Sequence, residues 1–316
     1  MEMMEAPTPI GPILAAMPVH NEEETVGTIV LQSLRHVDSV LCVDDGSSDA
    51  SARIARKLGA EIHHHRSNKG YGAALKSIFR IARERNASAL VLLDSDGQHD
   101  PSDIPVLLEP ILSGEADFVI GSRFIDGGSG DDMPAYRKLG VKVITAASNL
   151  SSNLDVKDTQ SGFRAFSREA LSRIRFDQDG MESTFEMLEA CVEKKLAVKE
   201  VPTVVRYDVP KGSRFTAMSH GFTVLSYALI TLSQKKPIIA FGVPGAGLLT
   251  LGSAIGMRAL NTVNDLTGET LNISVGPGLT AAWLGMLGVS LIFTGIVLQG
   301  ARTIMRRLMV RNFGVD

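Results

Sequence analysis

The sequence has little of what several common protein classes require. Its two cysteines, Cys42 and Cys191, are too few for a disulfide-bonded scaffold, and we expect both to be reduced packing residues. The net charge of −3 provides no basic excess for a phosphate backbone, so nucleic acid is not an expected partner. The N-terminal residues MEMMEAPTPIGP contain no apolar run typical of a signal peptide. With 44% hydrophobic residues among 316, the chain is expected to form one large or two modest domains.

The apolar residues are concentrated toward the C-terminus. No charged residue occurs between Lys236 and Arg258, or between Glu269 and Arg302. Each segment can supply the roughly 20 apolar residues that a helix needs to cross the hydrocarbon layer of a bilayer. Their repeated glycines favour close contact between helices in a membrane and would be costly in water. We therefore predict two transmembrane helices within residues 237–301; a pair of buried core helices is the alternative.

Basic residues flank these two segments and predict their orientation. Lys235 and Lys236 precede the first segment, whereas the connecting loop carries only Arg258 against two acidic residues. The second segment is followed by Arg302, Arg306, Arg307 and Arg311. Because cytoplasmic flanks carry the excess of lysine and arginine, we expect a multi-pass protein of the cell membrane with both termini in the cytoplasm.

The chain is therefore expected to divide into five parts. The apolar segment 215–236 lies between basic residues, which favours a helix in the membrane interface; a core helix of the preceding domain is the alternative. The parts are a flexible N-terminus (1–11), an α/β domain (12–214), the interfacial amphipathic helix (215–236), two transmembrane helices with a short external loop (237–301) and a basic cytoplasmic tail (302–316). Membrane lipid is thus an expected partner.

The predicted α/β domain alternates short β-type runs with helical patterns. We predict strands near ILAAMP, SVLCVDD, AEIHHH, ALVLLD, DFVIGS and VKEVPTVVRY. Helices are predicted at 22–35, 49–58, 71–85, 102–112, 136–150 and 181–195, with Asp49 and Ser102 as caps. Such alternation is typical of an α/β fold with a mostly parallel sheet and crossover helices.

Two carboxylates follow the fourth predicted strand, in VLLDSDGQHD. Asp94 and Asp96 come at the carboxyl end of a strand, where open α/β sheets bind ligands. Two carboxylates in one place repel each other unless they share a hard cation, and one or two carboxylates plus substrate phosphates commonly hold Mg²⁺ or Mn²⁺. Gln98 adds a neutral oxygen from the same turn. The pattern predicts a metal site; a solvated acidic turn is the alternative.

Three more polar loops follow predicted strands at the same edge of the sheet. MPVHNEEE follows the first strand, and VDDGSSDAS, with Asp44 and Asp45, follows the second. RSNKGYGAALKSI brings Lys69 and Gly70 to a helix start, where backbone amides can bind a phosphate. With the acidic loop, these segments outline a nucleotide pocket beside a metal.

Other familiar catalytic patterns are missing from the sequence. The chain has no Ser–His–Asp order and no zinc-ligand spacing. His63, His64 and His65 are consecutive, and because neighbours on a strand point to opposite faces, we do not expect them to bind a metal together. His99, beside the acidic loop, is a minor candidate for a metal ligand.

Six motifs, in their order and spacing, resemble those of the family-two inverting glycosyltransferases: PVHNEEE, VDDGSSD, NKGYGAAL, DSDGQHDP, GSRF and DTQSGFRAF. More narrowly, the chain resembles the polyprenyl-phosphate (dolichyl-phosphate) sugar synthases of the dolichol-phosphate mannosyltransferase type. The resemblance covers roughly residues 12–215. It implies a GT-A domain, which is Rossmann-like with a mostly parallel sheet, a nucleotide-sugar donor, and Mg²⁺ or Mn²⁺ as cofactor.

The resemblance also implies roles for individual residues. Those implied to line the base and ribose pocket are Pro18, Asn21, Glu22 and Asp45. Asp94 is implied to meet the sugar nucleotide, and the metal set consists of Asp94, Asp96 and Gln98. Lys69 and Gly70 complete the expected donor site.

Cations downstream of the acidic loop are expected to bind an acceptor phosphate, because the forked guanidinium of arginine matches phosphate. They are Arg123, Arg137, Arg164, Arg206, Lys211 and Arg214, with Ser213 in the same KGSR motif. Two alternatives stay open: Arg164 pairs structurally with Asp158, and Arg137 faces solvent. The family usually carries lysine where this chain has Arg214, a departure that keeps the charge.

The implied activity is an inverting hexosyl transfer from GDP-mannose or a UDP-hexose to dolichyl or polyprenyl phosphate. A metal would stabilise the leaving diphosphate, and arginines would position an acceptor that is already anionic. The candidate catalytic residues are Asp94, Asp96, Arg123, Arg137 and Arg206. A glycolipid or polysaccharide acceptor, a sugar nucleotidyltransferase and a non-catalytic membrane scaffold are the alternatives, although no QxxRW-type motif of processive synthases is present. The sugar, the base, the polyprenyl chain and the oligomeric state, for which a homo-oligomer is one option, stay open.

Overall fold

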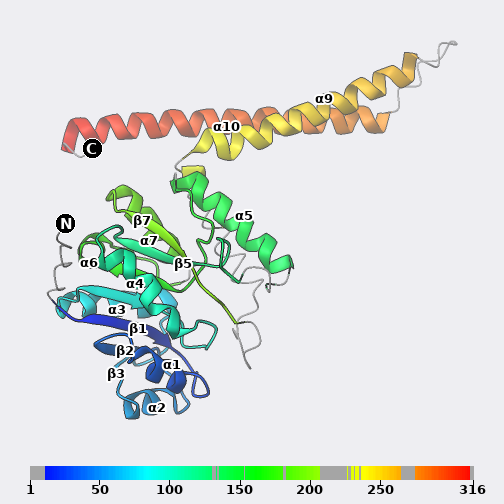
Figure 1. The fold of residues 1–316 in the computed structure, drawn as a ribbon. Coiled ribbons are helices and arrows are strands. Elements are labelled where there is room, and N and C mark those ends of the chain that lie inside the picture. The colour runs from blue at the N-terminus through cyan, green and yellow to red at the C-terminus, as the bar shows by residue number, and fades with distance from the viewer. Residues whose placement is uncertain are drawn as a thin grey trace, which may run out of the picture. The chain divides into compact units, whose positions relative to one another are not determined.

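A computed structural model describes residues 11–129, 133, 135–152, 154–180, 183–206, 226, 229–230, 232–234, 236–264 and 275–313. The chain forms two compact units, Met1–Ala228 and Leu229–Asp316 (Figure 1). The first contains the α/β domain, and the second contains two long helices. Most of the predicted interfacial helix (215–236) lies outside the described residues.

The α/β domain is organised around a seven-stranded sheet with the order β3-β2-β1-β4-β6-β5-β7. Its strands are β1 (Ile13–Val19), β2 (Ser39–Asp44), β3 (Glu61–His64), β4 (Ala89–Leu92), β5 (Phe118–Ser122), β6 (Arg164–Ser167) and β7 (Val198–Pro202). Only β6 is antiparallel, to both β4 and β5. The six strands expected from the sequence are all present. The short β6 was not predicted, because four residues carry too little periodicity.

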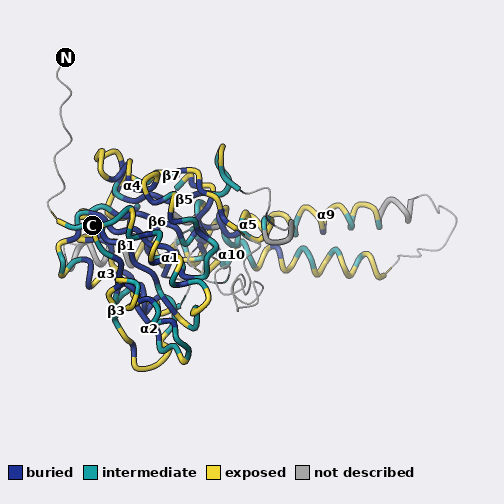
Figure 2. The backbone as a smooth tube through the Cα atoms, turned by 60° about the horizontal axis from the view of Figure 1, so that its bottom comes forward, coloured by how far each residue is buried: buried dark blue, intermediate teal, exposed yellow. Residues whose placement is uncertain are grey.

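Helices cover both faces of this sheet, so its central strands are buried on two sides (Figure 2). They are α1 (Val26–Ser33), α2 (Ser51–Lys57), α3 (Tyr71–Glu84), α4 (Ile104–Leu112), α5 (Ala135–Ser152), α6 (Arg168–Arg173) and α7 (Ser183–Glu193). Side chains of β1 alternate between two cores: Leu14 and Ala16 pack in one, Ala15 and Met17 in the other. The predicted α/β fold with a mostly parallel sheet is confirmed.

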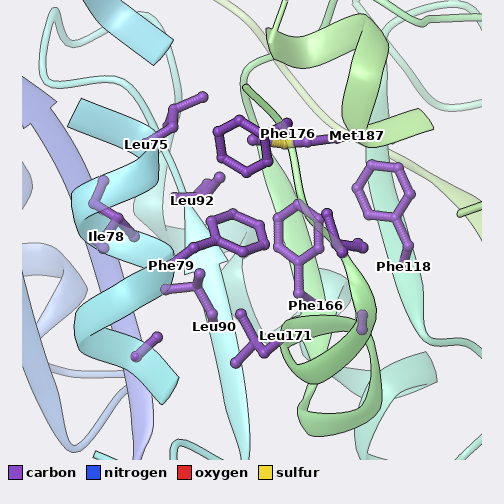
Figure 3. Packing of buried hydrophobic residues seen from close by; sticks show 14 of the residues in the cluster. Leu75, Ile78, Phe79, Leu90, Leu92, Phe118, Phe166, Leu171, Phe176 and Met187 are labelled. Carbon is purple, nitrogen blue, oxygen red and sulfur yellow. The ribbon is translucent and has the colours of Figure 1, made fainter. Parts of the chain in front are cut away.

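An aromatic cluster dominates one of the two cores (Figure 3). The ring of Phe166, from β6, stacks on Phe118 at 4.7 Å and meets Phe79, from α3, edge-on at 5.0 Å. Phe176 completes the cluster against Phe79 at 5.2 Å. Each buried ring stabilises the fold by about 1.5–3 kcal/mol. The cluster therefore joins β6 to α3.

Two local predictions have different outcomes. The helix containing α4 is preceded by a 3₁₀ turn, η1 (Pro101–Asp103), and it is the carboxylate of Asp100 that accepts from the amide of Ser102 (2.9 Å). The prediction of Ser102 as the cap was therefore wrong. The prediction for the cysteines is confirmed, since both are free and burial raises the pKa of each thiol to about 12.

The second unit pairs a short π-helical turn, η2 (Ile238–Gly242), and α9 (Val243–Asn264) with the long helix α10 (Val275–Phe313). Two segments are long and apolar enough to cross a membrane, Ile238–Ala259 and Val275–Ile304. Only 11% of their most apolar windows is buried within the structure, whereas core helices of a soluble protein are mostly buried. Two candidate membrane helices are thus present, and the alternative of buried core helices is disfavoured.

Glycines allow α9 and α10 to approach closely. A Cβ atom added to Gly288 would lie 2.7 Å from the carbonyl oxygen of Gly245, and one added to Gly252 would lie 3.0 Å from that of Ala281. Gly285, by contrast, has nothing within 4 Å of such an atom. The expected role of glycine in helix contact therefore holds for Gly245, Gly252 and Gly288, which let the two backbones meet.

We expect Gly288→Leu to separate α9 from α10, because a side chain at this position collides with backbone that cannot rotate away. Overpacking of this kind typically costs about 1–3 kcal/mol. Gly285→Leu adds the same side chain on the open side of α10 and is the matched control. The thermal unfolding temperature of the detergent-solubilised chain should be lowered by Gly288→Leu alone. Equal unfolding temperatures for the two variants would contradict the contact.

Candidate active site

The candidate site is built on the carboxyl ends of β1, β2 and β4, which are neighbours in the sheet. The loops after β1 and β2 are bonded to each other. Asn21, in a left-handed conformation (φ +58°), donates its amide to Ser47 Oγ (3.0 Å) and accepts from the amide of Ser48 (2.8 Å). The amide of Glu22 donates to Ser51 Oγ (2.7 Å). Asn21 and Glu22, two of the four residues predicted to line the base and ribose pocket, thus lie where these loops meet.

The acidic loop after β4 is anchored by the serine between its two aspartates. Ser95 is buried, and its hydroxyl donates to the carbonyl of Pro18 at the end of β1 (2.8 Å). The carbonyl of Ser95 accepts from the hydroxyl of Thr25 (2.6 Å). Asp94 and Asp96, on either side, remain partly exposed. Ser95 is thus the buried anchor of the loop, and the carboxylates on either side of it remain accessible to solvent.

The carboxylate of Asp94 is surrounded by His99 from its own loop and by groups from two other segments. Its Oδ1 accepts from the hydroxyl of Tyr71, the first residue of α3 (3.2 Å), and its Oδ2 lies 3.6 Å from Nε2 of His99. A Cβ atom at position 162 would lie 2.3 Å from Asp94 Oδ2, so a larger residue than Gly162 would displace this carboxylate. Burial raises the pKa of Asp94, but His99, Tyr71 and the nearby Arg164 outweigh it and lower the pKa below its usual value.

The pKa of Asp96 is shifted in the opposite direction from that of Asp94. Its Oδ1 accepts from the amide of Gln98 (2.9 Å). Burial and then the negative charge of Asp94 raise the pKa of Asp96 above its usual value. Protein groups therefore leave part of the negative charge of this loop uncompensated.

This donor set fits a hard divalent cation. Carboxylate and amide oxygens are the ligands that Mg²⁺ and Mn²⁺ prefer, and the loop supplies Asp94, Asp96 and Gln98. Among the described residues, no three or more His, Cys, Asp or Glu side chains converge as a closed cage. A cation held here by two carboxylates would complete its coordination with water and phosphate oxygens, as Mg²⁺ commonly does.

Asp45, at the end of β2, is buried and clamps the loop that precedes α3. Its two oxygens accept from the amides of Lys69 (3.0 and 3.1 Å) and Gly70 (2.9 Å). Nδ1 of His65 lies 2.6 Å from Oδ1. The carboxylate predicted to line the base pocket thus bonds to the protein itself and holds this loop in place.

The amides of Lys69, Gly70 and Gly72, near the start of α3, are bonded within the protein, contrary to the expectation that amides of this loop bind a phosphate. Those of Lys69 and Gly70 donate to Asp45, and that of Gly72 donates to the carbonyl of Asp179 (2.8 Å). The exposed side chain of Lys69 is the part of this loop that can still meet an anion. The expectation failed because the sequence does not reveal that residues 177–180 cover the helix start.

Arg123 and Arg164 differ in their surroundings. Arg123 forms a bidentate ion pair with Asp158, through Nε (2.6 Å) and Nη2 (2.8 Å), and Asp158 is fully buried. The partner of Asp158 is therefore Arg123, and the alternative that paired it with Arg164 was wrong.

Among the described residues, Arg164 is the largest fully buried side chain. Its guanidinium donates to the carbonyls of Thr159 (2.9 Å), Ser161 (2.8 Å) and Thr184 (3.4 Å). It therefore holds the loop that carries Gly162 against Asp94, and the expectation that it contacts an acceptor phosphate does not fit this burial. Nearby Tyr71 and Asp94 partly offset the lowering of its pKa by burial.

Arg206 lies directly beside the acidic loop. Its amide donates to the carbonyl of Gln98 (2.8 Å), and its Nη2 lies 3.2 Å from Oδ2 of Asp100. A hydrogen bond from Ser102 and the charge of Arg206 lower the pKa of Asp100. The side chain of Arg206 is 60% exposed, so it can still meet an anion.

The remaining predicted acceptor residues cannot be placed. Arg137 belongs to α5, but its side chain is outside the described part of the chain, as are Lys211, Ser213 and Arg214. Two residues that contact Asp94, Tyr71 and Gly162, were not predicted. Both lie inside the quoted motifs NKGYGAAL and DTQSGFRAF, and only the fold brings these motifs to β4.

We expect Arg123→Ala to destabilise the α/β domain by about 3–5 kcal/mol, because it removes the guanidinium that balances the buried charge of Asp158 and leaves only the amide of residue 123 bonded to that carboxylate. Arg173→Ala is the control, since its pair with Glu169 is half exposed and worth at most about 1 kcal/mol. Urea unfolding followed by circular dichroism measures both. A loss for Arg123→Ala no larger than that of the control would contradict the structural role of this ion pair.

Comparisons with known proteins agree with this geometry. Residues 15–175 match the family described as glycosyl transferase family 2. The chain is 30% identical over 244 residues to a UDP-N-acetylglucosamine–dolichyl-phosphate N-acetylglucosaminyltransferase of Methanococcus voltae, covering 71% of this chain and 97% of that protein. It is 31% identical over 200 residues to a polyprenol monophosphomannose synthase of Mycolicibacterium smegmatis, covering 60% and 75% of the two chains.

A solved structure shares the fold. Glucosyl-3-phosphoglycerate synthase of Mycobacterium tuberculosis, in complex with Mn²⁺, UDP and phosphoglyceric acid, aligns with a TM-score of 0.54 and 24% identity. The alignment covers 70% of this chain and 78% of that one. The matched family spans half of the sequence and includes β1 to β6 with the acidic loop between them. The chain therefore belongs to glycosyl transferase family 2 and is a glycosyltransferase.

Proposed function

We propose that the enzyme transfers a hexose from a nucleotide sugar to a polyprenyl phosphate, such as dolichyl phosphate, at the cytoplasmic face of a membrane. The observation that carries this proposal is the position of Arg206. Its amide is bonded to the acidic loop at Gln98, and its guanidinium is exposed beside that loop. An anionic acceptor would thus be bound next to the donor diphosphate. The names of the relatives from Methanococcus voltae and Mycolicibacterium smegmatis, which include dolichyl phosphate and polyprenol, support the same acceptor class.

The donor half of the proposed site is the acidic loop with the loops after β1 and β2. Mg²⁺ or Mn²⁺ would be held by Asp94, Asp96 and Gln98, and it would supply Lewis-acid stabilisation of the leaving diphosphate. The solved relative that binds Mn²⁺ and UDP supports a divalent metal. Tyr71 and His99 keep the carboxylate of Asp94 in one orientation, so that little reorganisation is needed when the donor binds.

The remaining donor contacts follow from the same loops. Pro18, Asn21 and Glu22 are proposed to meet the base and ribose where the first two loops join. Asp45 would act there through the loop that it holds, which carries Lys69. The identity of the base and of the sugar depends on the shape of this pocket, and both GDP-mannose and UDP-hexoses agree with these contacts.

The acceptor half needs no strong base in this proposal. A phosphate monoester is anionic near neutral pH, so its oxygen can attack C1 of the sugar once it is oriented. In one displacement, the new C1–O bond forms as the bond to the diphosphate breaks, and the configuration at C1 inverts. Arg206 would orient the phosphate, with Arg137, Lys211, Ser213 and Arg214 as further proposed contacts. A hydroxyl acceptor would require a general base in addition.

The second unit supports a membrane location for this reaction. A polyprenyl chain is confined to the bilayer, and two apolar helices anchor the enzyme where that substrate is found. Basic residues before Ile238 and after Val297 favour both termini in the cytoplasm, with residues 259–268 outside. The catalytic domain would then face the cytoplasmic pool of nucleotide sugars.

The metal proposal predicts a specific change in thermal stability. In excess chelator, Asp96→Asn should melt at or above the wild-type temperature. The pKa of Asp96 is raised in the folded protein, which means that its ionised carboxylate lowers the free energy of unfolding. The neutral amide of asparagine carries no charge and removes this destabilisation. Saturating Mn²⁺ should stabilise the wild type, by about 2.7 kcal/mol at 100 times the dissociation constant, but not the variant.

Asp103→Asn is the matched control, because its pKa is also raised by burial and it lies outside the proposed metal set. Differential scanning calorimetry of the solubilised enzyme measures all three proteins. If Asp96→Asn gained as much stability from Mn²⁺ as the wild type, the assignment of Asp96 to the metal would be rejected.

The acceptor proposal predicts that Arg206→Ala impairs use of the lipid phosphate rather than of the donor. Loss of a charge-assisted hydrogen bond, about 2 kcal/mol, should lower kcat/KM for dolichyl phosphate roughly thirtyfold. The donor KM should stay within about threefold, because Arg206 makes no contact with the loops after β1 and β2 in the described structure. Arg53→Ala, an exposed arginine on α2, is the control.

The assay incubates the enzyme with labelled UDP- and GDP-sugars and either dolichyl phosphate or uncharged dolichol. A charged lipid product formed only from the phosphate supports the proposal. Equal use of dolichol, transfer to a glycolipid instead, or a collapse of donor affinity in Arg206→Ala would each overturn the acceptor assignment.

A further inference from the structure

The three consecutive histidines at the end of β3 have three different environments. His64 is half exposed, with Nδ1 2.9 Å from Oδ2 of Asp44 and Nε2 2.9 Å from Nη2 of Arg56. His63 lines a surface pocket with residues of α3 and meets the His65 ring edge-on at 5.6 Å. Only the side chain of His65 is buried, at 5% exposure. The run is therefore not one site, and its last member is set apart by burial.

Both ring nitrogens of His65 are engaged. Nδ1 lies 2.6 Å from Oδ1 of Asp45, and Nε2 lies 2.8 Å from Oγ of Ser77 on α3. Because an ionised carboxylate only accepts, Nδ1 carries the proton of this contact. The hydroxyl of Ser77 fixes the ring from its other side. A ring held at both ends cannot rotate, so its N–H is aimed at Asp45 in a fixed direction.

The carboxylate of Asp45 in turn holds the backbone of residues 69 and 70. It accepts from Lys69 N and Gly70 N as well as from His65, which uses essentially all of its acceptor capacity. The loop that it holds is conformationally demanding, with Gly70 at φ +99°. Without the contact from His65, the carboxylate could rotate and release one or both amides. The loop carrying Lys69 would then lose its fixed position beside the donor site.

We propose that His65 is a positioning residue for nucleotide binding: by donating from Nδ1 to Asp45, it fixes the carboxylate that holds residues 69–70 at the edge of the donor pocket. Ser77 is the second member of this relay, because it sets the orientation of the ring. The inference rests on the proposed donor site and deepens it. His65 itself touches no reacting group, and it acts only through Asp45.

The test uses two side chains that place an amide nitrogen differently. In His65→Asn the amide nitrogen takes the place of Nδ1 and can still donate to Asp45. In His65→Gln the nitrogen reaches the place of Nε2, near Ser77, and the contact with Asp45 is lost. His63→Asn is the matched control, because His63 lies on β3, two residues before His65, but outside the relay.

Dissociation constants for UDP and GDP in the presence of Mg²⁺ are measured by isothermal titration calorimetry on the full-length solubilised enzyme. We expect His65→Gln to weaken binding of the preferred nucleotide about tenfold, which corresponds to about 1.4 kcal/mol. His65→Asn and His63→Asn should stay within about threefold of the wild type. In sugar transfer, His65→Gln should raise the donor KM and leave the acceptor KM unchanged.

Several outcomes would overturn the inference. One is wild-type nucleotide affinity in a folded His65→Gln variant, and another is equal weakening by His65→Asn and His65→Gln. If His65→Gln does not fold, Ser77→Ala decides, since it removes only the outer hydrogen bond and should still raise the donor KM. An unchanged donor KM in Ser77→Ala would refute the relay. A wild type that binds neither nucleotide would instead refute the proposed donor site, together with everything that rests on it.

Discussion

The structure of the catalytic domain depends on keeping two carboxylates accessible at the end of a buried strand. Asp94 and Asp96 repel each other, and burial adds to the cost of their charge. The protein compensates only one of them, by placing Tyr71, His99 and the buried cation of Arg164 around Asp94. The charge that remains on Asp96 is what makes the loop suited to a divalent cation. The charge of Asp96 thus destabilises the fold locally as long as no cation is bound.

Further carboxylates organise the loops around this pair. Asp45 holds the loop before α3, Asp158 holds Arg123, and Asp100 holds the side chain of Arg206 next to Gln98. In each case a carboxylate accepts hydrogen bonds from backbone or arginine donors and so holds two segments of the chain together. Such preorganisation suits a glycosyltransferase, in which positioning and electrostatic stabilisation contribute much of the catalysis.

The helices of the second unit associate in a different way from those of the catalytic domain. In a bilayer, apolar side chains gain nothing by leaving lipid, so helices associate through close packing of their backbones. Gly245 and Gly288 provide that contact between α9 and α10, and only 11% of the most apolar windows of the two helices is buried within the described structure. In the proposed membrane location, anchoring and catalysis would be served by separate units of one chain.

The sequence by itself determined the order of the strands and helices of the α/β domain except β6 and α6, the acidic loop at a strand end and the two apolar helices. These features rest on local periodicity, charge spacing and segment length, which tertiary contacts modify little. Only the tertiary structure decided that β6 is antiparallel, that Arg123 rather than Arg164 pairs with Asp158, and that Asp179 covers the start of α3. It also joined His65 to Asp45 and Ser77. These pairings connect segments far apart in the chain, and their partners are selected by strand register and burial, which no local pattern of residues encodes.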